Sequence, residues 1–199
     1  MAEQTQETDQ VRAEILTAAQ ERFRAFGYGK TTMAEIASDV DMSAANLYRY
    51  FHNKKDIAAA CARRCMADLN GLLENVIELP DLTATQRLHL FVQTALRYYY
   101  EMSHETPRLN ELVDTVAQNH SGLIHERNQR MEMLLAAILR QGVEEGDYSI
   151  SDIDNTARSV NKATVLFTTP FFIPLYTLEQ FESMAVDVVT LIIRGLEKN

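Results

Sequence analysis

The stretch MAEIASDVDMSAANLYRYFHNKKDI, residues 33–57, predicts two short helices with a tight turn between them. Thr32 and Glu35 form a capping box, in which hydroxyl and carboxylate satisfy main-chain N–H groups left unpaired at a helix start. Ser43 can cap the second helix, of about two turns over residues 44–51. Two short helices joined by so brief a turn form a helix-turn-helix.

A longer helix is predicted before this stretch, over residues 8–26. Its apolar residues recur at intervals of three and four and therefore share one face: Val11, Ile15, Ala19, Phe23 and Phe26. Gly27 can end this helix as a left-handed C-cap. The short helices and their turn supply the residues to close a small core against that face: Ile36, Ala37, Val40, Met42, Leu47 and Phe51.

The rest of the chain also reads as helical, because apolar residues recur at three and four without the sustained alternation of strands. Asn53 can cap a long fourth helix that Pro80 stops. We expect about five or six helices after the head, the last over residues 178–196. The predicted fold class is all-α, with a three-helix head followed by a larger helical domain.

Composition and charge fit a globular protein with one acidic part. The chain has 199 residues and a formal net charge of −9, yet residues 1–56 hold seven Lys and Arg against nine Asp and Glu. Most of the acidic excess lies further on, where it would keep that surface off DNA. The polar start is no secretory signal, no apolar segment is long enough for a membrane span, and two cysteines suit a reducing compartment. We expect a cytoplasmic protein without a membrane partner.

The outward face of the third helix carries residue types that read DNA. Ala44 and Ala45 permit close approach, while Asn46 and Arg49 can make paired hydrogen bonds to adenine and guanine. For Arg49 the alternative is an external ion pair.

Residues 31–57 resemble the signature of the TetR family. The matching residues are Thr31, Thr32, Ile36, Ala37, Ser43, Leu47, Tyr48, Tyr50, Phe51, Asn53, Lys54 and Lys55. The resemblance covers about the first third of the chain. It implies a DNA-binding domain over residues 1–56 and, over residues 57–199, a helical domain that dimerises and encloses a ligand pocket. Asp41 departs from the glycine common in the family's turn and must adopt a strained or left-handed conformation.

The same resemblance implies positions for DNA contact. Ala44, Ala45 and Asn46 occupy base-facing positions, and the backbone-contacting positions are Thr32, Tyr48, Tyr50 and Lys54. Tyr50 could instead belong to the core. The family's common behaviour is repression at a palindromic operator on double-stranded DNA, relieved by a ligand.

Other functions find little support. The chain has no phosphate-cradling glycine motif, no nucleophile elbow and no histidine pair at helical spacing, so we expect neither enzymatic activity nor a cofactor. An enzyme built from distant residues, or a helical module whose head binds another protein, stays open as an alternative.

The last helix has apolar residues on two faces and therefore needs two partners. With the helix before it, it could form a four-helix bundle between two subunits, where the resemblance also puts a homodimer. The candidate dimer residues are Val160, Thr164, Val186, Val189 and Ile193. Alternatively, one subunit's own core covers both faces.

Aromatic and sulfur side chains concentrate in the second domain and could line a pocket for an unknown small apolar effector. The candidates are Phe91, Tyr98, Tyr99, Met102, Met131, Phe167 and Phe171. Plain core packing is the alternative. Cys61 and Cys65 lie four residues apart on an apolar helix face, which favours a core role over a thiol sensor or a metal site.

Overall fold

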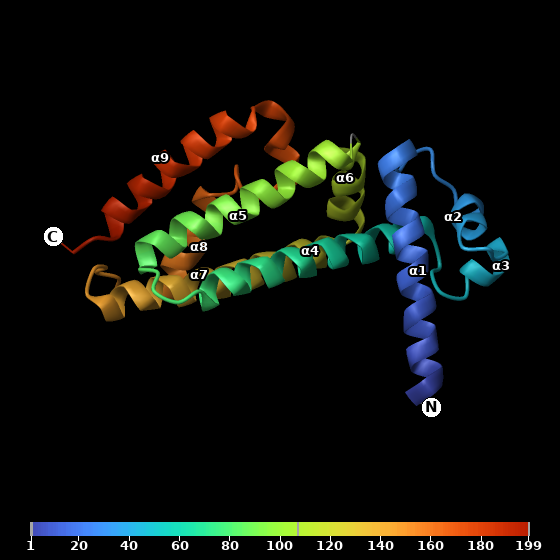
Figure 1. Ribbon diagram of the computed structural model, residues 1–199, viewed down its shortest axis with the longest axis horizontal. Coiled ribbons are helices and arrows are strands. Elements are labelled where there is room, and N and C mark those ends of the chain that lie inside the picture. The colour runs from blue at the N-terminus through green and yellow to red at the C-terminus, as the bar shows by residue number, and fades with distance from the viewer. Residues whose placement is uncertain (1, 107, 199) are drawn as a thin grey trace. The chain divides into compact units, whose positions relative to one another are not determined.

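In the computed structural model, which describes residues 2–106 and 108–198, the chain consists of α-helices and one 3₁₀ segment, without a β-strand (Figure 1). The elements are α1 (Ala2–Phe26), α2 (Met33–Asp39), α3 (Ala44–Leu47), α4 (Lys54–Glu78), α5 (Ala84–Glu105), α6 (Leu109–Asn119), α7 (Ser121–Glu145), α8 (Ile153–Ala163), η1 (Pro170–Leu175) and α9 (Leu178–Leu196). The predicted all-α fold is confirmed. No helix within the described ranges is long and apolar enough to cross a membrane.

Contacts divide the chain into two compact units. The head unit comprises Met1–Cys65 with His104–Leu123, and the body unit comprises Met66–Ser103 with Ile124–Asn199. Helix α6 therefore belongs to the head, although it lies far along the chain from α1 to α3. This grouping differs from the division at residue 56 expected from the sequence, because long-range contacts leave no local pattern.

Helices α1 and α2 end and begin where the sequence predicts. Gly27 ends α1 with a φ of +85°, and its N–H donates to the carbonyl of Phe23 at 3.0 Å. Helix α1 starts earlier than the predicted residue 8. At the start of α2, Thr32 and Glu35 form the predicted capping box with both of its hydrogen bonds.

The turn and α3 also follow local signals. Asp41 has a φ of +52°, the left-handed conformation expected at this position. The Ser43 hydroxyl accepts the N–H of Asn46 at 3.2 Å and caps α3. Regular helix ends at Leu47 rather than at residue 51, because the N–H groups of residues 49 and 50 donate to carbonyls three residues back.

The head has a core of its own. Its buried residues come from α1 to α4 and the turn after α3: Ile15, Ala19, Phe23, Ile36, Ala37, Leu47, Phe51, Ile57 and Cys61. Val40 and Met42, predicted for this core, are only partly buried against it. Burying each large apolar side chain contributes about 1.5–3 kcal/mol to stability. Because α2 and α3 both contribute side chains to this core, their packing fixes the angle between the two helices.

The body core is formed by the later part of α4 with α5, α7, α8 and α9. Arg87 of α5 closes the end of α4: its guanidinium donates to four carbonyls, those of Val76, Ile77, Leu79 and Leu82. Its Nε donates to Gln141 at 2.8 Å. All five N–H groups of this buried cation therefore have acceptors, and carbonyls at a helix end are satisfied.

Candidate DNA interface and effector region

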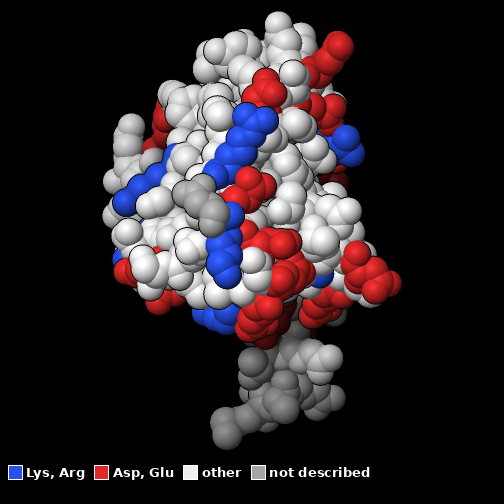
Figure 2. Space-filling view, turned by 90° about the vertical axis from the view of Figure 1, so that its left-hand side faces the viewer, with Lys and Arg blue, Asp and Glu red and all other residues white. Residues whose placement is uncertain are grey.

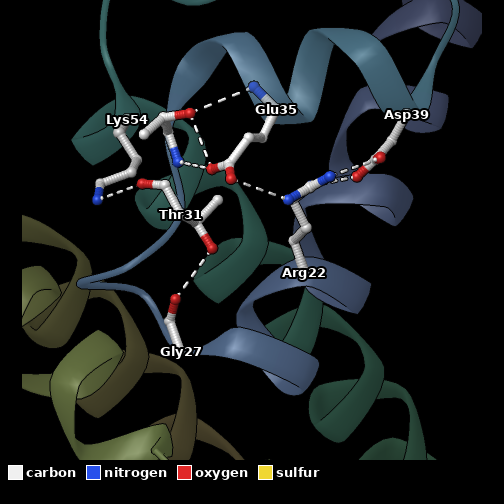
Figure 3. A network of polar contacts seen from close by, with 7 residues as sticks. Arg22, Gly27, Thr31, Glu35, Asp39 and Lys54 are labelled. Atoms are coloured by element: carbon white, nitrogen blue, oxygen red, sulfur yellow. Dashed lines mark hydrogen bonds and ion pairs between the residues drawn. The ribbon is translucent and has the colours of Figure 1, made fainter.

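Hydrogen bonds fix the loop between α1 and α2 (Figure 3). The Thr31 hydroxyl donates to the carbonyl of Gly27 at 2.9 Å. Thr32 donates to the Glu35 carboxylate through its main-chain N–H and its hydroxyl, each at 2.8 Å. These hydrogen bonds lower the pKa of Glu35. Thr32 is thereby held, exposed, at the start of α2, where the family resemblance places a backbone contact.

Arg22 ties α1 to α2. Its guanidinium binds both carboxylate oxygens of Asp39, with Nη2 2.9 Å from Oδ1, and lies 3.5 Å from Glu35 (Figure 3). The hydrogen bonds from Arg22 lower the pKa of Asp39, and those to Asp39 raise the pKa of Arg22. The two-pronged geometry orients α2 on α1 more than it stabilises the fold, since these groups are in contact with water.

The outer face of α3 is open. Ala45 and Arg49 are exposed, Ala44 and Asn46 are partly buried, and Leu47 points into the core. Within the described chain the Arg49 guanidinium has no hydrogen bond or ion pair, so the alternative of an external ion pair finds no support. Small side chains beside an amide and a guanidinium form a surface that can approach base edges.

The four residues predicted to contact the DNA backbone differ in their surroundings. Thr32 is exposed and Tyr48 is 49% exposed, while Tyr50 packs partly buried against the head core. Lys54 is committed inside the head: its ammonium donates to the carbonyls of Tyr28 and Thr31, both at 2.7 Å, and lies 4.3 Å from the centre of the Tyr28 ring. Burial there lowers the pKa of Lys54.

Helix α6 holds the same loop from another side, a contact that the sequence did not indicate. The Gly29 N–H donates to the Glu111 carboxylate at 3.0 Å. A Cβ on Gly27 would lie 2.6 Å from Cδ of Arg108, so the close approach requires glycine there. Leu112 packs against the head core. In the sequence, the signal that could have indicated this contact is the pair Gly27 and Gly29 just before the capping box.

The predicted effector residues mostly gather in the body core. Four of them are buried: Phe91, Tyr99, Met131 and Phe167. Tyr98 and Met102 are partly buried against these. Phe171 differs, because it lies on η1 with 50% of its surface exposed. An open depression of about 540 Å³ lies elsewhere, in the head between α1 and α2, with acidic residues Glu14, Glu21 and Asp39 in its lining. It does not suit an apolar ligand.

The predicted dimer residues are mostly inside the subunit. Val160, Thr164, Val189 and Ile193 are buried in the chain itself, and only Val186 is exposed, at 40%. The physical reason is that one face of α9 packs into the body core of the same subunit, where the Phe181 ring lies 6.3 Å from that of Phe167. The opposite face keeps an exposed apolar residue, Leu191, at 65%.

The two cysteines lie in surroundings that favour a core role. Cys61 is buried and Cys65 partly buried, as the apolar stripe predicts. Burial raises the pKa of Cys61 to about 12. Among the described residues no group of His, Cys, Asp and Glu is arranged to hold a metal ion.

The body carries a cluster of exposed acidic residues. Figure 2 shows Asp and Glu gathered in patches, with narrower stretches of Lys and Arg between them. Exposed acids occur at the end of α7 and the start of α8: Glu144, Glu145, Asp147, Asp152 and Asp154. Such a surface disfavours contact with phosphates.

Comparison with known families gives two matches. Residues 15–61 match the profile described as bacterial regulatory proteins, tetR family. Residues 84–189, more than half of the chain, match the profile described as Tetracyclin repressor-like, C-terminal domain.

Individual relatives are distant. The transcriptional repressor KstR2 of Mycobacterium tuberculosis is 25% identical over 157 residues, 77% of each chain. The uncharacterized regulator YhgD of Bacillus subtilis is 24% identical over 134 residues, 66% of each chain.

Solved structures share the fold. A transcriptional regulator from Cytophaga hutchinsonii has a TM-score of 0.72 at 19% identity, covering 92% of this chain and 97% of that one. SmeT, the repressor of the Stenotrophomonas maltophilia efflux pump SmeDEF, has a TM-score of 0.66 at 19% identity, covering 94% and 91%.

Proposed function

Because this chain belongs to the TetR family of bacterial transcriptional regulators, we propose that it represses transcription from a palindromic operator and leaves it when a small apolar or aromatic molecule binds. The family consists of DNA-binding regulators rather than enzymes, and its members usually act as dimers with small-molecule effectors. This function places the protein in the cytoplasm, where the DNA is.

The outward face of α3 is the observation that carries the DNA-binding part. Its small residues lie beside Asn46 on a helix that Ser43 caps and Leu47 anchors. Arg49 follows in the turn after α3, and its guanidinium has no partner within the described chain. Asn46 and Arg49 would read bases, and Thr32 with Tyr48 would hold the phosphates. Lys54 would contribute to DNA binding by holding the loop between α1 and α2, whose carbonyls accept its hydrogen bonds.

The effector part is supported by the body core. Tyr99, Met131 and Phe167 come from different segments and meet in one apolar cluster, which suits an apolar guest. Helix α4 runs through both units, so a guest that prefers another placement of its body part would weaken DNA binding by linkage. A coupling of about 1–3 kcal/mol is typical of such switches.

Selection of bound genomic fragments with the purified full-length protein would test the proposal. We expect enrichment of a two-fold symmetric sequence, with an affinity that falls steeply as salt rises. Asn46→Ala should then weaken binding to that operator by roughly 1–3 kcal/mol while leaving binding to random duplex nearly unchanged.

Lys54→Ala is the matched control, since it should weaken binding to all duplexes alike. Equal losses on operator and random DNA for Asn46→Ala would remove its base-reading role. Enrichment of no sequence at all, with the protein folded, would overturn the proposed function.

A further inference from the structure

Arg127 of α7 is a half-buried cation whose partners are all neutral. Its Nε donates to the Tyr99 hydroxyl at 3.2 Å, its Nη1 to the amide oxygen of Asn128 at 3.1 Å, and its Nη2 to the main-chain carbonyl of Thr168. Its guanidinium carbon lies 5.8 Å from the centre of the Tyr99 ring. Within residues 2–106 and 108–198, no carboxylate lies within 4.0 Å of this guanidinium.

Among the described residues of the body unit, three arginines are at least partly buried, Arg87, Arg127 and Arg130, and Arg127 is the one with neither a carboxylate partner nor a full set of protein acceptors. In the head, Arg12 is also partly buried and donates to a neutral acceptor, the Tyr50 carbonyl. Five described arginines have a carboxylate partner: Arg22, Arg24, Arg97, Arg108 and Arg130. Arg87 also lacks one, but all five of its N–H groups have protein acceptors. Arg127 has acceptors for three of its five N–H groups in the described chain. A partly desolvated cation with unused donors favours a nearby anion.

The position of Arg127 joins this cation to the predicted effector residues. Tyr99, which accepts its hydrogen bond, is buried in the body core. Met131 lies one helical turn further along α7 and is buried in the same core. Phe167 directly precedes Thr168, and its ring lies 6.3 Å from that of Phe181. A ligand group held by Arg127 would therefore have apolar side chains next to it.

We propose that Arg127 binds the carboxylate of an otherwise apolar effector, so that this regulator responds to hydrophobic organic acids. The inference rests on the proposed function, because it names the chemical class of that effector. A guanidinium matches a carboxylate with two parallel N–H donors, a geometry that a neutral amide or alcohol cannot reproduce. Tyr99 would keep the fork in place through its hydroxyl.

Matched acids and amides provide the test. Decanoic acid, 4-phenylbutanoic acid and 1-naphthoic acid, each beside its primary amide, would be titrated calorimetrically into the full-length protein. We expect at least one acid to bind about 10–100-fold more tightly than its amide, since a hydrogen bond to a charged group contributes about 1.5–3 kcal/mol. Arg127→Gln should reduce this ratio to about one.

Two further variants separate recognition from structure. Arg130→Gln changes another arginine of α7 and removes its ion pair with Glu74 of α4; this variant should leave the acid preference unchanged. Arg127→Lys keeps the charge and should retain a weaker preference, even where Arg127→Gln fails to fold by circular dichroism.

Three results would overturn the proposal: equal affinity of acid and amide for the wild-type protein, a preference that survives in Arg127→Gln, or no binding of any acid. Operator binding is measured separately and without ligand. If the ligand-free wild-type protein binds no operator, the proposed function is refuted. If an amide releases the operator, that function stands and only the claim that the effector carries a carboxylate is refuted.

Discussion

Asp41 occupies the left-handed region, with a φ of +52°, in the turn of the helix-turn-helix. Most residues lose about 1–2 kcal/mol in this conformation, while Asp is tolerated because its short polar side chain can hydrogen-bond locally. We predict that Asp41→Ala lowers the free energy of unfolding by about 1 kcal/mol, whereas Asp41→Gly leaves it within about 0.5 kcal/mol. Urea unfolding followed by circular dichroism would measure both. An alanine variant as stable as the glycine variant would contradict this account.

The two cysteines should differ in reactivity for the same kind of local reason. Burial raises the pKa of Cys61 to about 12, so its thiolate is nearly absent at a pH of about 8. We predict that iodoacetamide alkylates Cys65 in the folded protein and leaves Cys61 unmodified, as peptide mass spectrometry would show. Cys65→Ser should then abolish labelling of the folded protein, while in urea the wild type should be labelled at both sites. Equal labelling rates for Cys61 with and without urea would refute its burial.

At the scale of helices, the sequence predicts boundaries where a neighbouring residue encodes them. The Thr32 capping box is such a case, because its partner Glu35 lies only three residues away. Helix α6 is the opposite case. Its contact between Glu111 and Gly29 spans 82 positions, and no periodicity along the chain records a partner that far away.

That contact makes α6 part of the DNA-binding head, and it can be tested through Gly29. We predict that Glu111→Ala speeds hydrogen exchange of the Gly29 amide about 3- to 10-fold, as expected for losing a net 0.5–1.5 kcal/mol hydrogen bond. Operator affinity should fall by a similar factor, because the loop before Thr32 loosens.

Glu105→Ala is the control for this change. Glu105 pairs with Arg24 at 3.2 Å, also in the head, but both side chains are more than half exposed, so the pair contributes little. Identical behaviour of the two variants would show that Glu111 does not position the loop.

At the scale of the whole molecule, the sequence identifies α9 as doubly apolar but not which face the subunit itself covers. Val189 is 1% exposed and Val186 is 40% exposed, although both belonged to one predicted surface. Helical periodicity reports that two faces are apolar. Which face remains open is decided by how α9 packs into the body core. The same limit applies to Phe171, whose apolar character suggested an interior position.

The exposed face of α9 leads to a prediction about assembly. Leu191→Glu should convert a dimer to a monomer that keeps its helical content, because it adds charge to a surface that would become buried between subunits. Val189→Glu should instead lower stability or prevent folding, since it places an unpaired charge in the subunit core. Sedimentation and circular dichroism would separate the two effects. A Leu191→Glu protein that stays dimeric would place the interface elsewhere.

The hydrogen-bond donors of Lys54 link a single side chain to the complex of protein and DNA. An ammonium has three N–H donors, and two of them are used by the carbonyls of Tyr28 and Thr31. We predict that the third donates to a phosphate when DNA is bound, so that the duplex would be held to the main chain of the loop through one nitrogen atom. DNA binding and the conformation of the loop would then stabilise each other. Lys54 in the complex should accordingly resist acylating reagents more than Lys55, whose ammonium donates to Asn119 at 2.8 Å.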